Sequence, residues 1–149
     1  MIRLSKLTDY AIVVMSEMGR RPDATHTVAQ LAERTGVPAP TVAKLMKSLT
    51  PAGLMRSQRG ASGGYTLAQA PAAITIADIV TALDGPIALT ACVDGADDQC
   101  GVETLCPMRG GWEKINSAIR AALESVTLAD MMAPAWAPPA GERPLAAAL

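Results

Sequence analysis

The chain has 149 residues, of which 50% are hydrophobic and only 3% aromatic, and its formal net charge is −1. This length suits one folded domain with a small appended element, and the hydrophobic share excludes a disordered chain. No apolar stretch approaches the ~18 residues of a membrane span and the N-terminus has no secretory signal, so we expect a cytoplasmic protein with no membrane partner.

Charge is divided unevenly along the chain. Residues 1–67 carry nine Lys and Arg against four acids, a net charge of +5, whereas the remaining residues carry four against ten, a net charge of −6. A basic first half can meet phosphates, while an acidic second half is repelled by them. The charge pattern therefore favours double-stranded DNA as a partner of the first half.

The first predicted helix runs from Leu4 to Met18, with apolar residues at helical spacing. Ile12 and Val13 make its opposite side partly apolar as well, and Asp9 lies near that second face. A small domain rarely covers both faces of one helix. We therefore expect a homodimer in which this helix touches the partner subunit.

A helix-turn-helix is predicted next. Thr27 and Gln30 have the spacing of a capping box at the start of its first helix, and Gly36 permits the tight turn. The second helix is expected from about Pro40 to Leu49. Its outward face would offer to DNA the residues Thr41, Lys44, Lys47 and Ser48.

A β-hairpin follows, with strands at 54–58 and 65–67 joined by the glycine-rich turn 59–64. After a helix-turn-helix, such a hairpin is typical of a wing. Its glycines let the backbone lie close to a phosphate, so we predict that Arg56 and Arg59 contact DNA, with Arg59 in the minor groove. The alternative is a plain hairpin with incidental arginines.

A capped helix from Thr75 to Gly85 completes a winged domain over residues 1–85. Residues 86–110 lack periodicity and carry Cys92, Cys100 and Cys106 at Cys-x7-Cys-x5-Cys spacing. Three thiolates can converge on one iron-sulfur cluster, whereas an odd number of thiols cannot all pair within one chain. A disulfide switch, a zinc site or three unremarkable thiols are the alternatives.

Residues 111–132 predict a long amphipathic helix followed by a short terminal helix capped by Thr127. A helix this apolar needs another surface, and pairing with its symmetry mate gives a two-fold dimer suited to two DNA half-sites. Packing on its own domain is the alternative. Ala and Pro dominate residues 133–149, which predicts a flexible tail. The expected fold is mainly α, a winged helix-turn-helix with a small β-hairpin wing and a long C-terminal dimerisation helix.

Together these motifs resemble the Rrf2 family of bacterial winged helix-turn-helix regulators, in its IscR-like and NsrR-like forms. The resemblance rests on segments 3–11, 59–65, the cysteine loop and 127–130 in the family's order. Segment 100–109 is most similar to the branch that regulates SUF-type iron-sulfur cluster assembly. The resemblance implies a homodimeric repressor whose [2Fe-2S] or [4Fe-4S] cluster reports cluster, iron or redox status.

The resemblance also implies a ligand set. In IscR-like members a His three residues after the last cysteine completes the site, but that position is Arg109 here, and a guanidinium cannot ligate iron. In NsrR-like members the ligand is an Asp from the partner's first helix, and Asp9 matches it. The implied metal ligands are Cys92, Cys100, Cys106 and Asp9, with Glu103 and the loop aspartates as alternatives and His26 as a solvated loop residue.

Two other classes of protein are weighed against this interpretation. A winged helix used only for protein contact would lack the steep salt dependence of phosphate docking. An enzyme is disfavoured because the sequence has no His-centred triad, phosphate-binding glycine loop or paired-carboxylate pocket, so no small-molecule substrate is expected.

Overall fold

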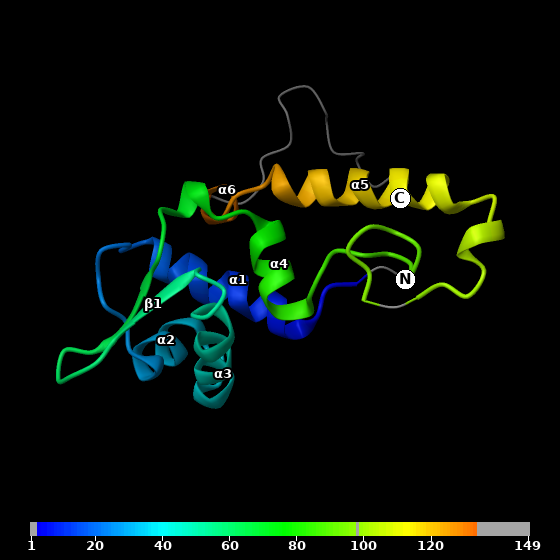
Figure 1. Ribbon diagram of the computed structural model, residues 1–149. Coiled ribbons are helices and arrows are strands. Elements are labelled where there is room, and N and C mark those ends of the chain that lie inside the picture. Colours follow the sequence, from blue (N-terminus) through cyan, green and yellow to red (C-terminus); the bar gives the residue numbers. More distant parts are fainter. Residues whose placement is uncertain (1–2, 98, 134–149) are drawn as a thin grey trace, which may run out of the picture.

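The structure is a computed structural model that describes residues 3–97 and 99–133, without the side chains of Glu103 and Arg109. It is mainly α with one small sheet, as predicted (Figure 1). The predicted tail lies outside the described residues except for Ala133. The elements in chain order are α1 (Lys6–Gly19), α2 (Val28–Thr35), α3 (Ala39–Leu49), β1 (Met55–Gln58), β2 (Gly64–Leu67), η1 (Pro71–Ala73), α4 (Ile76–Asp84), η2 (Glu103–Leu105), α5 (Arg109–Glu124) and α6 (Leu128–Met132).

Helix α1 is the central helix of the fold. Ser5 caps it, because the Ser5 Oγ accepts a hydrogen bond from the backbone N–H of Thr8 at 3.1 Å. Its inner face is fully buried, and the helix packs against α2, α3, α4, α6 and β2. Val13 on the outer side is 42% exposed. One face of α1 therefore remains available for contact outside this chain.

The helix-turn-helix has the predicted construction. Thr27 and Gln30 form a reciprocal capping box at the start of α2. Gly36 ends α2 with a φ of 74°, in the left-handed region that glycine adopts without a steric penalty. Helix α3 then turns a buried apolar face toward the core, made of Val42, Leu45, Met46 and Leu49. The polar residues of α3 are left on the outside.

The wing is an antiparallel hairpin in which Met55 pairs with Leu67 and Gln58 with Gly64. A short extra pairing secures its base, because the backbones of His26 and Tyr65 exchange two hydrogen bonds of 2.8 Å. His26 is consequently only 2% exposed, and its Nε2 lies 3.2 Å from the Arg21 carbonyl oxygen. The expectation that His26 is a solvated loop residue is wrong, since backbone pairing draws it into the core.

Helix α5 packs against α4, and α6 returns to pack on α1 and η1. Leu128 is fully buried there, and its N–H donates to the Ile74 carbonyl oxygen at 2.8 Å. Thr127 and Asp130 form the predicted cap of α6. Figure 1 shows α5 on the opposite side of the molecule from α2 and α3. Within the described part of the chain, no helix is long and apolar enough to cross a membrane.

Candidate nucleic-acid interface and cysteine loop

Helix α3 presents a polar face opposite its buried one. Lys44 and Lys47 are exposed, and Thr41 and Ser48 are half-buried beside them. Thr41, Lys44 and Ser48 follow one another at helical spacing, so they share one side of α3. Among the described residues, a salt bridge joins Arg20 to Glu17, but no salt bridge involves Lys44 or Lys47. The face can therefore offer free positive charge to phosphates and hydroxyl groups to base edges.

The wing adds two further cations. Arg56 is exposed on β1 and Arg59 is exposed in the turn that follows. Gly60 in the same turn has a φ of 110°, which only glycine adopts without strain. Figure 1 shows the hairpin and the α2–α3 pair on the same side of the molecule, away from α5. The structure thus groups all six predicted DNA-binding residues on the wing and the outer face of α3.

The three cysteines lie between α4 and α5, and the structure does not gather them. All three are free and half-buried. Among the side chains that the structure describes, which leave out that of Glu103, no three of Cys, His, Asp or Glu lie close enough to hold a metal ion. Asp9 is exposed on α1. The predicted ligand set of three cysteines and Asp9 is therefore not assembled within one copy of the chain and stays a prediction.

The first half of the cysteine loop is docked on α5. The Asn116 Oδ1 accepts a hydrogen bond from the Leu89 N–H at 3.0 Å, and the Glu113 Oε2 accepts one from the Asp94 N–H at 2.9 Å. The Arg120 guanidinium donates to the Asp94 carbonyl oxygen at 3.2 Å. Positions 113, 116 and 120 share one face of α5. We call these three side chains the α5 clamp.

The α5 clamp holds the chain on both sides of Cys92, at Leu89 and at Asp94. Val93 beside it is 5% exposed, and the Cys92 Sγ lies 3.3 Å from the Thr90 Oγ1. The second half of the loop is more open, with Leu105 next to Cys106 at 90% exposure. Cys92 therefore lies in the docked half of the loop, whereas Cys100 and Cys106 lie on residues 99–108, which we call the outer segment.

The start of the loop is also tied to α1. Asp84, the last residue of α4, accepts hydrogen bonds from the Thr8 Oγ1 at 2.8 Å and from the Ser5 N–H at 3.3 Å. Partial burial would raise the pKa of Asp84, but the hydrogen bonds from Ser5 and Thr8 outweigh it and lower that pKa below its ordinary value. The loop is thereby anchored to the first turn of the helix that carries Asp9.

Asp9 itself lines a hollow of about 410 Å³ on the outer side of α1. The hollow combines apolar side chains from α1 and α6, Val13 and Met131, with the cations Arg20 and Arg34 and with Glu17, which forms a salt bridge to Arg20. Val13 and Met131 are both large exposed hydrophobic residues. This surface can therefore accept a segment that has exposed apolar residues.

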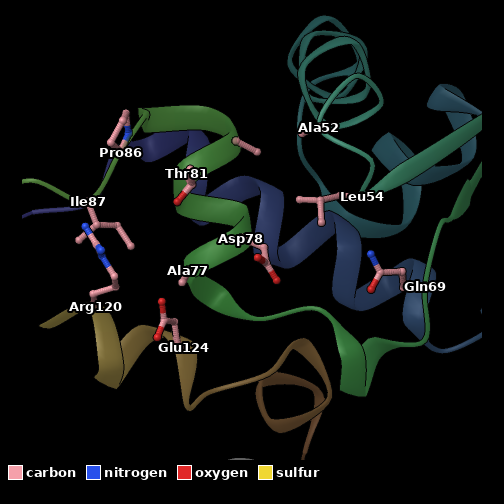
Figure 2. A pocket seen from close by; sticks show the side chains of 11 residues that line it. Ala52, Leu54, Gln69, Ala77, Asp78, Thr81, Pro86, Ile87, Arg120 and Glu124 are labelled. Carbon is pink, nitrogen blue, oxygen red and sulfur yellow. The ribbon is translucent and has the colours of Figure 1, made fainter. Parts of the chain in front are cut away.

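A second hollow of about 680 Å³ separates α4 from α5 (Figure 2). Asp78 on α4 and Glu124 on α5 lie on its two sides, and Arg120 lies beside Ile87 at its edge. None of the predicted DNA-binding or metal-binding residues lines it. Because Arg120 of the α5 clamp lines it, this hollow borders the attachment of the cysteine loop to α5 and is separate from the candidate DNA-binding face.

Sequence reasoning missed the α5 clamp and the bond between Asp84 and Thr8. Asn116 carries a signal that could have revealed the clamp, because it is a polar residue four positions after Trp112 and three before Ile119, on the apolar stripe of α5. It is fully buried, as that position predicts. No comparable signal marks the Asp84 contact, because its partners are 76 and 79 residues away in the sequence.

Comparison with known proteins places these features in context. The family described as "Rrf2: Iron-dependent Transcriptional regulator" matches residues 4–134. The transcriptional regulator IscR of Photobacterium profundum is 30% identical over 132 residues, which cover 88% of this chain and 76% of that protein. The regulator CymR of Bacillus subtilis is 29% identical over 131 residues, covering 87% and 89% of the two chains.

Two solved structures share the fold. The structure of CymR, the global cysteine regulator of B. subtilis, matches with a TM-score of 0.67 at 29% identity and covers 89% of this chain and 97% of its own. The structure of T. potens IscR matches with a TM-score of 0.64 at 30% identity, covering 88% and 86%. All of these relatives are transcriptional regulators by name, and none is an enzyme.

Proposed function

Because the chain belongs to the Rrf2 family of transcriptional regulators, we propose that it is a homodimeric DNA-binding repressor that senses iron-sulfur cluster, iron or redox status. The genes it controls would include those for SUF-type cluster assembly. The observation that carries this proposal is the combination of a free basic face on α3 and the wing with three unpaired thiols in one loop.

DNA docking uses the two basic elements. Lys44, Lys47 and Arg56 bind phosphates, because they are exposed and have no acidic partner among the described residues. Thr41 and Ser48 on the same helix read base edges in the major groove. Arg59 at the wing turn enters the minor groove, where negative potential attracts guanidinium groups.

The dimer would form through exposed apolar residues. Trp112 and Ile115 on α5 are 41% and 47% exposed, which is unusual for large apolar side chains on one helix face. Pairing α5 with its symmetry mate removes this surface from water and gives about 25 cal/mol for each Å² of apolar area buried. A two-fold dimer then carries two α3 helices for two half-sites of an operator.

The cysteine loop is the proposed sensor. The donor set suits an iron-sulfur cluster chemically, with the thiolates of Cys92, Cys100 and Cys106 and the Asp9 carboxylate of the second copy as the fourth ligand. Such a group, [2Fe-2S] or [4Fe-4S], would supply a link between the ligands that is lost on oxidation. The role of the protein is to hold Cys92 on the α5 clamp and to bring the outer segment to it.

Exposed apolar residues support the contact with the second copy. Val102, Leu105 and Met108 on the outer segment are exposed, and so are Val13 and Met131 beside Asp9. Figure 1 places η2 far from α1 of the same chain. The outer segment of one copy would therefore pack on the α1 hollow of the other, and that packing would bring Asp9 to the thiols.

The signal would pass to DNA through α1. The Asp84 carboxylate ties the start of the loop to Ser5 and Thr8, and α1 packs directly on α2 and α3. A change in the loop would thus alter the placement of α1 and with it the distance between the two α3 helices. Because the operator half-sites have a fixed spacing, this distance sets operator affinity.

A second function has its own support. CymR of B. subtilis is named a cysteine regulator, and within the described residues the three thiols do not form a metal site. A regulator of this kind would use the thiols as a redox switch without a cluster. A zinc ion in place of the cluster is the other alternative, and it too would need the thiols to converge.

One experiment distinguishes the two functions. The protein is purified without oxygen, and its visible spectrum, iron and acid-labile sulfide are measured on one sample. Cluster sensing predicts a brown protein with matched iron and sulfide, which Cys92→Ala lacks. A colourless, iron-free protein after anaerobic reconstitution would refute cluster sensing and favour the thiol or zinc function.

A further inference from the structure

We propose that two copies of the chain pair their α5 helices antiparallel, so that Trp112 of each copy packs on Ala122 of the other. The inference deepens the proposed function and rests on it in one respect, that the protein is a homodimer. It adds the direction and the residue pairing of the dimer, and these explain how the outer segment of one copy reaches the α1 hollow of the other.

A row of apolar residues runs along α5 and its two ends. Its members are spaced alternately four and three positions apart, and we call them the α5 seam: Met108, Trp112, Ile115, Ile119, Ala122 and Val126. Four of them are large side chains that the structure leaves 36–58% exposed: Met108, Trp112, Ile115 and Val126. Spacing that alternates between four and three is the pattern by which two helices pair in a coiled coil. The exposed face of α5 therefore fits another helix.

The charged residues of α5 lie outside the seam. Glu113 and Arg120 turn toward the cysteine loop of their own chain, where they bind Asp94. Glu124 borders the hollow between α4 and α5 (Figure 2). At 3.6 residues per turn, these three residues and Lys114 lie roughly 120° or more around the helix from the middle of the seam. A second α5 can therefore approach the seam without meeting any of these charges.

The sizes of the seam residues favour antiparallel pairing. In the antiparallel register Trp112 of one copy meets Ala122 of the other, and the same register pairs Ile115 with Ile119. A large side chain then faces a small one, which fills the seam evenly. Parallel pairing would oppose two Trp112 side chains in one layer and two Ala122 side chains in another. The first layer would be crowded and the second would contain a void, and both are destabilising.

The position of α5 on its own chain favours the same direction. The last turn of α5 leads into α6, which packs on α1, whereas the first turn lies at the far end of the helix (Figure 1). The 16 residues of α5 separate these ends by roughly 24 Å. Parallel pairing would bring the α6 helices of both copies to one end. Antiparallel pairing places the first turn of one α5 beside α6 of the other copy.

This direction also completes the proposed sensor. The outer segment ends at Met108, directly before α5, and Met131 on α6 lines the hollow that contains Asp9. An antiparallel pair therefore delivers the outer segment of one copy to Asp9 of the other, as the proposed ligand set requires. The seam spans fewer than three heptads, which is short for a coiled coil, so the second contact also enlarges the interface.

The test is photocrosslinking of the full chain. Trp112 is replaced by the photoreactive residue p-benzoylphenylalanine, which keeps a bulky aromatic side chain in the seam. A mixture of ¹⁵N-labelled and unlabelled copies identifies links between chains by mass. Trypsin cleaves after Lys114 and Arg120, so Trp112 and Ala122 fall into different peptides. Antiparallel pairing predicts a link to the peptide that starts at Ala121, whereas parallel pairing predicts a link to the peptide that ends at Lys114.

Two further variants complete the experiment. The photoreactive residue in place of Met108 should link to the same peptide from Ala121 onward, because Val126 lies on it. In place of Lys114, outside the seam, it should give no link between chains. A protein that sediments as a monomer would refute the homodimer itself. A dimer in which both seam probes link to their own peptides, or give no link between chains, would overturn only the antiparallel pairing.

Discussion

The Thr8 hydroxyl group donates a hydrogen bond of 2.8 Å to the Asp84 carboxylate, which fixes the first turn of α1 to the last residue of α4. These residues are 76 positions apart, and they join the helix that carries Asp9 to the start of the cysteine loop. The bond lies between the proposed sensor and the helix-turn-helix, because α1 packs on α2 and α3.

Replacing Asp84 by Asn should lower stability at neutral pH. The hydrogen bonds from Ser5 and Thr8 depress the pKa of Asp84 in the folded state, so the stabilisation is present above the ordinary value of 3.8 and is lost as the pH falls through the folded value. The carboxylate is exposed, which limits the effect to about 1 kcal/mol. Thermal unfolding should show a gap between Asp84→Asn and wild type at pH 7 that closes below pH 3.8.

The control for this prediction is Asp97→Asn, which removes an exposed carboxylate from the same loop region. If the stability difference between Asp84→Asn and wild type had the same size at all pH values, the role of the Asp84 charge would be contradicted.

Replacing Lys47 by Ala should weaken operator binding in a salt-dependent way. Each phosphate contact releases counterions, so loss of one contact should lower the slope of log affinity against log salt by about 1. The matched variant Lys114→Ala removes an exposed lysine from α5, and its slope should equal that of wild type. Fluorescence anisotropy at several salt concentrations measures both. Equal slopes in the two variants would exclude Lys47 from the interface.

Replacing Gly64 by Ala should damage the wing. Gly64 has a φ of 152°, and an added Cβ would lie 2.5 Å from the His26 carbonyl oxygen. The strain and the lost pairing should cost about 1–3 kcal/mol of unfolding free energy. Operator affinity should fall as well, because Arg56 and Arg59 lie on this hairpin. Urea unfolding and DNA titration measure the two effects.

Gly110→Ala is the control for the wing variant. Gly110 lies in α5 with no atom within 4 Å of an added Cβ. Alanine should therefore stabilise the helix, by up to about 1 kcal/mol. If both glycine variants unfolded at the same urea concentration, the tight contact at His26 would not matter.

Replacing Ile115 by Glu should separate the proposed dimer. A charge in an apolar interface is costly to bury, so the variant should sediment as a monomer at concentrations where wild type is a dimer. Lys114→Glu introduces the same carboxylate at the neighbouring position and should remain dimeric. Analytical ultracentrifugation measures both variants. A dimeric Ile115→Glu would place the subunit interface away from α5.

The helices, their caps and the hairpin could be predicted because their signals are local. The Thr27 capping box, the Gly36 turn and the Thr127 cap each depend on residues within a few positions of one another, and the structure confirms all three. Apolar periodicity likewise located α5, which begins at Arg109, two residues earlier than predicted. The match of residues 4–134 to the Rrf2 family confirms the resemblance.

The site could be predicted only in part, because its remaining contacts are not local. His26 was misjudged since its burial comes from backbone pairing with Tyr65, 39 positions later in the sequence. The loop from 86 to 110 has no periodicity, so its docking on Glu113, Asn116 and Arg120 had no pattern to predict it. The arrangement of the metal ligands stays a prediction, because it requires a second copy of the chain.

The most direct test of the central claim is the operator affinity of one protein preparation before and after removal of its cluster. The duplex is selected from a random pool for tight binding, and Cys92→Ala is titrated beside wild type without oxygen. If the cluster controls DNA binding, wild-type affinity changes at least about tenfold, or about 1.4 kcal/mol, when the cluster is removed, while Cys92→Ala shows one constant affinity. Equal wild-type affinity in the two states would contradict the claim that the cysteine loop controls DNA binding.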